Sequence, residues 1–146
     1  MSKRHALPFS TTLHVRDTCL CLHTQRAARA LARRFDEALR PAQLTSGQFS
    51  LLMALNRPEP PRIGDVAVLL GMDRTTLTAA LKPLERRGLV TVTIDEADKR
   101  GRRLVLAPAG RSALVAAMPL WEQTEAAIER LVGDANRLRG ELNALA

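Results

Sequence analysis

The segment DEADKRGRRLVLAPAG, residues 95–110, carries four Lys or Arg side chains among the five residues 99–103. Such a dense cationic loop attracts phosphate groups and predicts a polyanionic partner. Arg100 is the predicted tip residue, and Arg102 is a further predicted contact. Asp98 would repel phosphate, so we expect it to pair with an arginine and fix the shape of the loop. The alternative is a charged hairpin that only keeps an edge strand soluble.

A helix expected at residues 74–87 carries a second group of side chains suited to nucleic acid. Its buried face is predicted to hold Leu77, Leu81 and Leu84, which recur at helical spacing. The opposite stripe consists of Thr75, Thr78, Ala79, Lys82 and Arg86. Short side chains permit close approach to a groove, threonines reach base edges or phosphates, and Arg74 can reach guanine. The alternative is an ordinary solvated helix face.

The order of elements around these segments predicts a winged helix-turn-helix, mainly α with a small β-hairpin wing. Earlier helices are expected at residues 11–39, from Thr45 or Ser46 to before Pro58, and at residues 63–70, closed by Gly71. Strands are expected at 89–94 and 102–106. A further helix is expected at about 109–132, and after a break at GDAN a last short helix that runs through Leu145. Inside the helix 74–87, Pro83 predicts a kink, which either re-aims the helix start or is tolerated near the helix end.

Composition limits the class of protein. The 146 residues are 46% hydrophobic, enough for the core of one domain. No apolar stretch is long enough to cross a membrane, and the start MSKRHALPFSTT lacks the apolar block of a signal peptide, so we expect a cytoplasmic protein without a membrane partner. The net charge of +7 favours a polyanionic partner, and the excess of positive charge lies outside residues 104–146.

Two stretches resemble the MarR family of bacterial winged-helix transcription regulators. They are LGMDRTTLTAALKPLERRGLV, residues 70–90, and DKRGRRLVLAPAG, residues 98–110, in the register D-x-R followed by L-x-x-x-G. The resemblance implies a homodimer whose first and last helices interlock and whose two lobes bind a pseudo-palindromic operator. It also implies repression that is relieved by a small ligand or an oxidant, although activation would use the same DNA contacts.

The resemblance also assigns roles to single residues. It matches the start of the recognition helix to Arg74, Thr75, Thr76 and Thr78. It matches Asp98 and Arg100 to the wing pair of the family. Ala107 departs from the pattern, because the family usually has a threonine there that caps the next helix. Pro108 is expected to compensate for part of that loss.

We therefore divide the single chain 1–146 into dimerisation helices at 11–40 and 109–146 and a DNA-binding lobe at 41–108. The carboxyl-terminal segment supports a dimer independently, because it holds more apolar anchors than one small lobe needs to cover. These anchors are Leu114, Met118, Trp121 and Ile128. The alternative is a monomer whose terminal helices fold back on the core.

Cys21 and Cys19 are candidate redox sensors. On one long helix they would point about 200° apart and could not bond to each other. Cys21 resembles the reactive cysteine of the peroxide-sensing branch of the family, which surrounds its thiolate with tyrosines. This chain has no Tyr, so His14, His23 or an arginine would have to activate the thiol in place of the tyrosines. The alternatives are a plain buried thiol and an organic effector in the cleft between the dimer helices and the lobe.

The leading hypothesis is a dimeric, sequence-specific DNA-binding regulator, and the family resemblance favours a repressor. The alternative is a winged-helix module for protein–protein contact without specific DNA binding. Cys19 and His23 stand at the spacing of two metal ligands, but zinc needs three or four, so neither a metal nor a cofactor is predicted. No phosphate-binding glycine loop and no nucleophile with an evident base are found, so we do not predict an enzyme.

Overall fold

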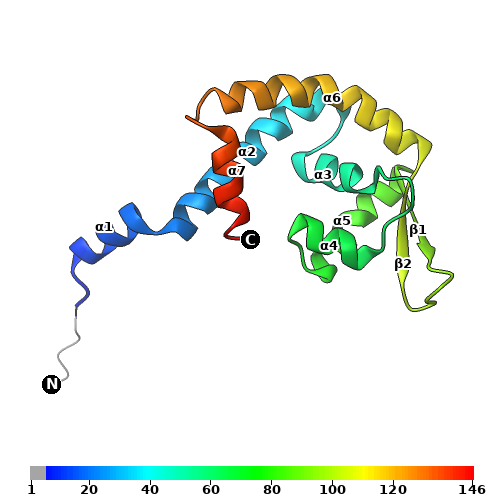
Figure 1. Cartoon of the computed structure of the whole chain (residues 1–146), viewed down its shortest axis with the longest axis horizontal. Helices are drawn as coiled ribbons and strands as arrows, with labels where there is room; N and C mark the ends of the chain where they lie inside the picture. The colour runs from blue at the N-terminus through cyan, green and yellow to red at the C-terminus, as the bar shows by residue number, and fades with distance from the viewer. Residues whose placement is uncertain (1–5) are drawn as a thin grey trace.

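The computed structural model describes residues 6–146, so part of the amino-terminal segment for which no signal peptide was predicted lies outside the described residues. Figure 1 shows a small lobe at one end of an extended arm of helices. The helices are α1 (Phe9–Thr18), α2 (Leu20–Leu39), α3 (Ser46–Leu55), α4 (Ile63–Leu70), α5 (Arg74–Arg86), α6 (Pro108–Glu129) and α7 (Ala135–Asn143). The strands are β1 (Val90–Ile94) and β2 (Arg102–Leu106), and a 3-10 turn spans Arg40–Ala42.

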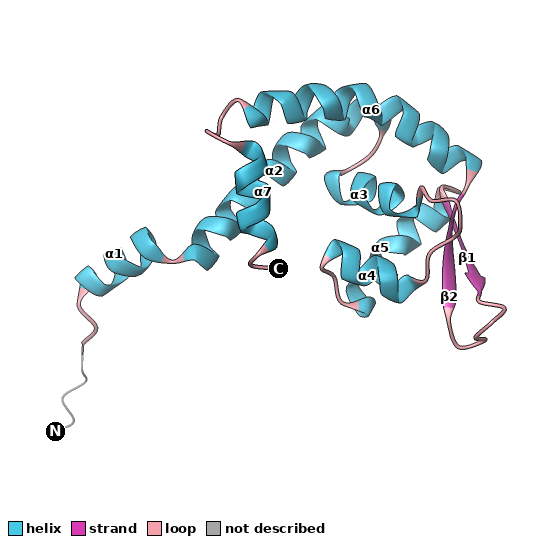
Figure 2. Ribbon diagram, viewed as in Figure 1, coloured by secondary structure: helices cyan, strands magenta, loops and turns pink. Residues whose placement is uncertain are grey.

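The lobe is a winged helix-turn-helix, as expected. Its helices α3, α4 and α5 are followed by the antiparallel hairpin β1–β2, in which Val90 pairs with Leu106 and Ile94 with Arg102 (Figure 2). The arm consists of α1, α2, α6 and α7; α2 packs along α6, and α1 projects beyond them at the end away from the wing.

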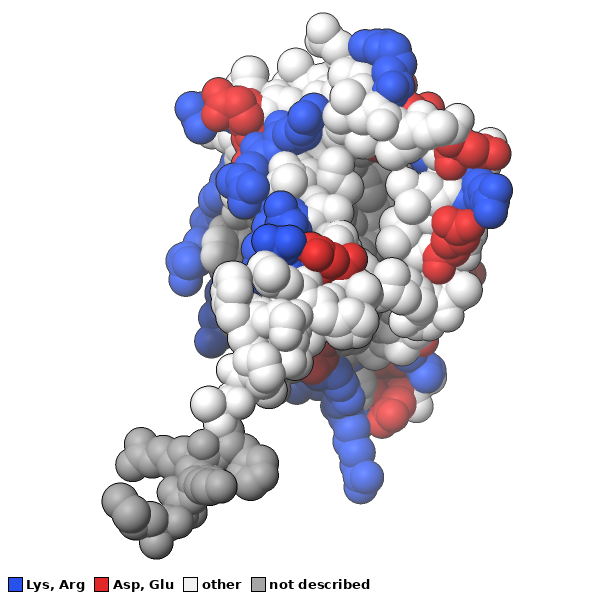
Figure 3. Space-filling view, turned by 90° about the vertical axis from the view of Figure 1, so that its left-hand side faces the viewer, with Lys and Arg blue, Asp and Glu red and all other residues white. Residues whose placement is uncertain are grey.

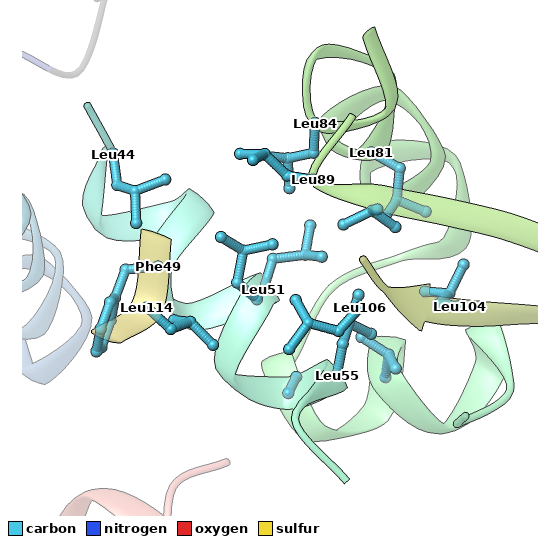
Figure 4. Packing of buried hydrophobic residues seen from close by; sticks show 14 of the residues in the cluster. Leu44, Phe49, Leu51, Leu55, Leu81, Leu84, Leu89, Leu104, Leu106 and Leu114 are labelled. Atoms are coloured by element: carbon cyan, nitrogen blue, oxygen red, sulfur yellow. The ribbon is translucent and has the colours of Figure 1, made fainter. Parts of the chain in front are cut away.

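The core of the lobe consists mainly of leucines, joined by Ile63 and Val66 of α4 and Val90 of β1 (Figure 4). Leu77, Leu81 and Leu84 of α5 are almost fully buried, which confirms the predicted inner face of that helix. Burying a leucine contributes about 2 kcal/mol, so these three side chains hold α5 firmly against the lobe. The helix continues through Pro83 for one further turn to Arg86.

Helix ends follow the local chemistry of the sequence. Thr45 and Gln48 form a capping box at the start of α3, in which each side chain binds the backbone of the other residue. Gly71 ends α4 with a positive φ of 63°, a conformation that costs glycine nothing. Asp73 then caps α5 only two residues later, which produces the tight turn of the helix-turn-helix.

The single helix expected at residues 11–39 is wrong, because the chain breaks at Cys19. This residue has an extended backbone with ψ of 107°, and its sulfur accepts the Leu22 N–H at 3.4 Å as the cap of α2. The Thr18 hydroxyl donates to the His14 carbonyl at 2.7 Å. Cysteine and threonine side chains that bond to nearby backbone offer an alternative to the helix, which accounts for the break.

Helix α6 joins the lobe to the arm. Pro108 stands at its first turn and Ala107 precedes it without a capping oxygen, as predicted. At its other end α7 folds back, capped by Asp134, and Arg139 forms ion pairs with Glu125 at 3.4 Å and Glu129 at 2.9 Å. None of the helices in residues 6–146 is long and apolar enough to cross a membrane.

Candidate nucleic-acid interface

The amino end of α5 is exposed to solvent and is capped by the side chain of Asp73. The Asp73 carboxylate accepts the Thr76 N–H at 2.7 Å and the Thr76 hydroxyl at 2.8 Å. These two hydrogen bonds from Thr76 lower the pKa of Asp73 below its ordinary value, so the carboxylate is ionised at neutral pH. Since the Thr76 hydroxyl donates its proton to the cap, Thr76 is left with acceptor capacity only.

The predicted contact stripe of α5 faces solvent. Arg74, Thr75, Thr78 and Lys82 are all exposed, opposite the buried leucines. The Thr78 hydroxyl donates to the Arg74 carbonyl at 2.7 Å, so its lone pairs remain as acceptors. Acceptors of this kind match the amino groups of adenine and cytosine in the major groove, and the arginine and lysine supply donors for guanine or phosphate.

The wing tip is shaped by Asp98, although not by the predicted pairing with an arginine side chain. Its carboxylate accepts the backbone N–H of Arg100 at 3.0 Å, and its carbonyl accepts the Gly101 N–H at 2.8 Å. Within the described residues no ion pair joins Asp98 to an arginine. A short aspartate side chain reaches the backbone two residues ahead more easily than a distant guanidinium, which is the geometry of an Asx turn.

The two predicted wing contacts differ in their surroundings. Arg100 lies within the turn and is exposed. Arg102 is also exposed, but its guanidinium donates to the carbonyls of Lys99 at 3.3 Å and Gly101 at 3.1 Å, so it is engaged with the backbone of the wing. Of the two side chains, that of Arg100 is therefore more available to enter a groove of DNA.

Asp95 is a residue of the wing that sequence reasoning missed. It is only 3% exposed, and its carboxylate lies 2.9 Å from Arg62 Nε and 3.5 Å from Arg103 Nε. Burial by itself would raise the pKa of Asp95, but the Ala97 N–H and the charges of Arg103 and Arg62 together lower it. No pattern separates Asp95 from the neighbouring acids in the sequence, because the decisive partner, Arg62, lies before α4.

Hydrogen bonds from the side chain of Arg103 and from the backbone of β2 join this strand to the proline-rich connector, residues 57–62. The Arg103 guanidinium donates to the Pro60 carbonyl at 2.8 Å, and the Leu104 N–H donates to the Pro61 carbonyl at 3.0 Å. Arg62 also forms an isolated bridge with Arg103. The connector therefore lies alongside the second strand of the wing and pairs with it at one residue.

Positive charge is not confined to the lobe. Figure 3 shows Lys and Arg side chains mainly along one edge of the face in view, whereas basic and acidic side chains occur together along the opposite edge. A hollow on α2 is lined by His23, two alanines and three arginines: Ala27, Ala30, Arg26, Arg29 and Arg33. Net charge therefore does not by itself locate a nucleic-acid interface on this molecule.

The two cysteines lie at the start of α2, away from the lobe. Because Cys19 is the cap and not a helical residue, the predicted angle between Cys19 and Cys21 does not apply. Both thiols are free, and Cys21 is exposed. His23 Nδ1 lies 2.7 Å from the Cys19 carbonyl and not at its sulfur. No group of three or more His, Cys, Asp or Glu that could hold a metal lies within the described part of the chain.

An apolar pocket of about 370 Å³ opens between α3, α4 and α6. Phe49 and Trp121 stack within it, with ring centroids 6.2 Å apart. The described lining residues are all uncharged: Phe49, Ser50, Met53, Ala54, Leu69, Leu70, Met118 and Trp121. The size and lining suit a small organic molecule, and the pocket lies where α6 of the arm meets the helix-turn-helix.

Known proteins share this arrangement. The family model described as the MarR family matches residues 44–101, which include the helix-turn-helix and the wing tip. The transcriptional regulator MosR of M. tuberculosis, solved in complex with DNA, is 40% identical over 87% of this chain and 92% of that chain, with a TM-score of 0.81. The chain belongs to the MarR family.

Other similar proteins are less identical to this chain. The transcriptional repressor CouR, solved with a 23-mer DNA duplex, is 30% identical over 90% of this chain and 94% of that chain, with a TM-score of 0.77. The transcriptional activatory protein BadR of Rhodopseudomonas palustris is 34% identical over 59% of this chain. The match spans about half the length of BadR. By their names, CouR is a repressor and BadR an activator of transcription, so similar proteins regulate in opposite directions.

Proposed function

We propose that this chain is a sequence-specific DNA-binding transcription regulator that acts as a homodimer on a pseudo-palindromic operator. The observation that carries the proposal is the single lobe on which the exposed start of α5 and the cationic wing tip occur together. The DNA complexes of MosR and CouR support it. A regulator that binds chromosomal DNA works in the cytoplasm, and no catalytic role is proposed for it.

In this proposal α5 enters the major groove and the wing lies along the flanking minor groove. Arg74 and Lys82 supply donors to guanine or phosphate, while Thr75, Thr76 and Thr78 approach base edges closely. Arg100, with Arg102 behind it, reaches the narrow and strongly negative minor groove. Residues 41–108 form the DNA-binding lobe.

The exposed apolar side chains support a homodimer through residues 11–40 and 109–146. Most large hydrophobic residues that face solvent lie on or next to the terminal helices: Leu7, Phe9, Val15, Leu20, Leu31, Leu131, Leu138, Leu142 and Leu145. A monomer rarely exposes so many apolar side chains on one part of its surface. A second copy would cover them and would place two lobes on one two-fold axis, as a pseudo-palindrome requires.

The regulatory signal in this proposal is a small organic effector bound in the apolar pocket. A ligand there would contact α3 and α4 of the lobe and α6 of the arm at once. It would therefore favour one spacing of the two lobes over another, which changes their fit to two half-sites.

An oxidant is the alternative signal, sensed at Cys21 or Cys19. Cys21 is exposed in the first turn of α2, where an oxidant can reach it, and Cys19 caps the same helix. Oxidation of Cys19 would remove that cap. Mass measurement after peroxide treatment tests the idea, because thiols that stay unmodified at oxidant levels that release DNA would rule it out.

The test of the function is a titration of the protein with a duplex from the region upstream of its own gene and with a scrambled duplex, each at two salt concentrations. Base readout persists at the higher salt, whereas phosphate attraction is lost. Binding to the native duplex alone at the higher salt supports the proposal. If neither that duplex nor one selected from a random pool is preferred, the protein–protein module becomes the better description.

A further inference from the structure

Asp95 stands apart from the other acidic residues of the wing. Glu96 and Asp98 are exposed, whereas the Asp95 carboxylate is removed from water at the point where β1 enters the loop. Burying a carboxylate is costly unless opposite charges and hydrogen bonds compensate for the lost water. The groups that compensate the buried Asp95 carboxylate must therefore be arranged around it.

The partners come from three segments of the lobe. Arg62, at the cap position of α4, lies 2.9 Å from Oδ2, and Arg103 of β2 lies 3.5 Å from Oδ1. The Ala97 N–H donates to Oδ1 at 3.1 Å. Oδ2 has the charge of Arg62 beside it but no donor in hydrogen-bond geometry among the described residues, so the ion pair is its main compensation.

The rest of the loop closes over this carboxylate. The Asp95 N–H donates to the Gly101 carbonyl at 3.1 Å, which ties the two sides of the tip together. A Cβ on Gly101 would lie 3.4 Å from the Asp95 Cβ and 3.3 Å from the Asp98 carbonyl, so the turn is packed closely against Asp95. The tip that carries Arg100 thus rests directly on the buried ion pair.

We propose that Asp95 is a positioning residue that locks the wing to the start of the helix-turn-helix through Arg62 and Arg103. Arg100 is then held at a fixed place relative to α5 before DNA is bound. This inference rests on the proposed function and adds a residue outside the predicted contacts. A two-stranded hairpin is at best marginally stable by itself, and ordering it during binding would reduce affinity.

Charge and position make opposite predictions for Asp95. Asp95→Asn removes a negative charge near the DNA, so by electrostatics alone it would raise affinity. If Asp95 locks the wing, the same change lowers affinity because the wing becomes mobile. Glu96→Gln is the matched control, since it removes one negative charge from the exposed neighbouring position.

Limited trypsin digestion tests the lock without DNA. The tip offers cleavage sites after Lys99, Arg100, Arg102 and Arg103. We expect cleavage there to be about tenfold faster in Asp95→Asn than in the wild type, because proteolysis follows local opening. Glu96→Gln should match the wild type. Equal rates in all three proteins would overturn the proposal, whether or not the protein proves to bind DNA.

The second experiment compares duplexes with and without the sequence that flanks the operator. The wild type and Glu96→Gln should lose about tenfold in affinity when the flanks are removed, since the wing loses its site. Asp95→Asn should bind both duplexes equally and should equal the wild type on the short duplex. A uniform loss on both duplexes would mean that Asp95 only supports the fold and would refute the positioning role.

Arg62→Lys provides a second route if Asp95→Asn does not fold. It keeps the positive charge but shortens the reach and removes the guanidinium that pairs with Asp95. Faster cleavage of the tip and a reduced flank dependence are again expected. Unchanged cleavage in a folded Arg62→Lys protein would contradict the lock.

Discussion

The carbonyl oxygen of Leu89 lies in the space that a Cβ atom on Gly110 would occupy. Leu106 Cδ1 would lie 2.7 Å from the same Cβ. The Leu89 carbonyl also accepts the Ala107 N–H at 3.0 Å, so the residue before β1 is fastened to the start of α6. The glycine of the L-x-x-x-G pattern is therefore required by close packing where the wing meets the arm.

Gly110→Ala should destabilise the protein by about 2 kcal/mol, because the added methyl group forces backbone or core side chains apart. Urea unfolding of the two proteins at equal concentration measures the change. Gly64→Ala in α4 is the control, since a Cβ there meets nothing within 4 Å and alanine favours helix. Equal midpoints for Gly110→Ala and the wild type would contradict the packing seen here.

Asp73 predicts a specific acid sensitivity of α5. Its pKa is lowered in the folded state, so its contribution to stability is complete above the unfolded value near 3.9 and is lost as pH falls through the lower folded value. Asp73→Ala should lower Tm by about 3 °C at pH 7. Thermal scans from pH 7 to pH 2 should show this difference shrinking only below about pH 4. A difference that persists undiminished at pH 2 would argue against the cap.

Arg100→Ala should weaken operator binding by roughly tenfold to a hundredfold, the usual cost of a lost arginine contact to a groove. Titrations with a labelled operator at one salt concentration measure it. Arg130→Ala, at the far end of α6, removes the same charge away from the wing and should bind almost as the wild type does. Equal losses in both variants would indicate a general effect of charge.

Leu138→Glu combined with Leu142→Glu should convert the proposed dimer into monomers. Both leucines are partly exposed on α7, and a buried glutamate without a partner opposes association. Light scattering on an eluting column gives the mass directly. Val68→Glu, exposed on α4 of the lobe and outside residues 11–40 and 109–146, should leave the dimer intact. A double variant with the mass of the wild type would exclude α7 from the interface.

Trp121 reports on the apolar pocket. It is the single Trp and the chain has no Tyr, so intrinsic fluorescence excited at long wavelength arises from the pocket alone. Benzyl alcohol should change this signal at concentrations about tenfold lower than benzoate, because the lining offers no charge to a carboxylate. Ala54→Phe should fill the pocket and abolish the response. An equal response to both compounds, or one that survives in Ala54→Phe, would place the ligand elsewhere.

Several local features of the fold were predictable from sequence for identifiable reasons. Caps such as Thr45 and Asp73, and the terminator Gly71, act within a few residues, so their effects are written in adjacent letters. The leucine spacing of α5 likewise defines its inner face, and hence the outer stripe with Arg74 and Thr78. Whether those side chains contact DNA remains a prediction that the experiments above would test.

The break at Cys19 was less accessible. Helical periodicity continues across residues 11–39, and the thiol cap uses a weak acceptor that sequence patterns do not distinguish from a buried cysteine. Asp98 shows a related limit, because the sequence predicted a shaping role but not that the partner would be the Arg100 backbone.

The sequence by itself determined most of the elements, the caps Thr45 and Asp73, the buried face of α5 and the cationic tip of the wing, since these depend on local propensity and on periodicity. Only the tertiary structure decided that Asp95 is buried against Arg62 and Arg103, that Gly110 must lack a side chain beside Leu89, and that an apolar pocket surrounds Trp121. Each of these depends on segments far apart in the chain, whose contacts arise only when the hydrophobic core brings them together.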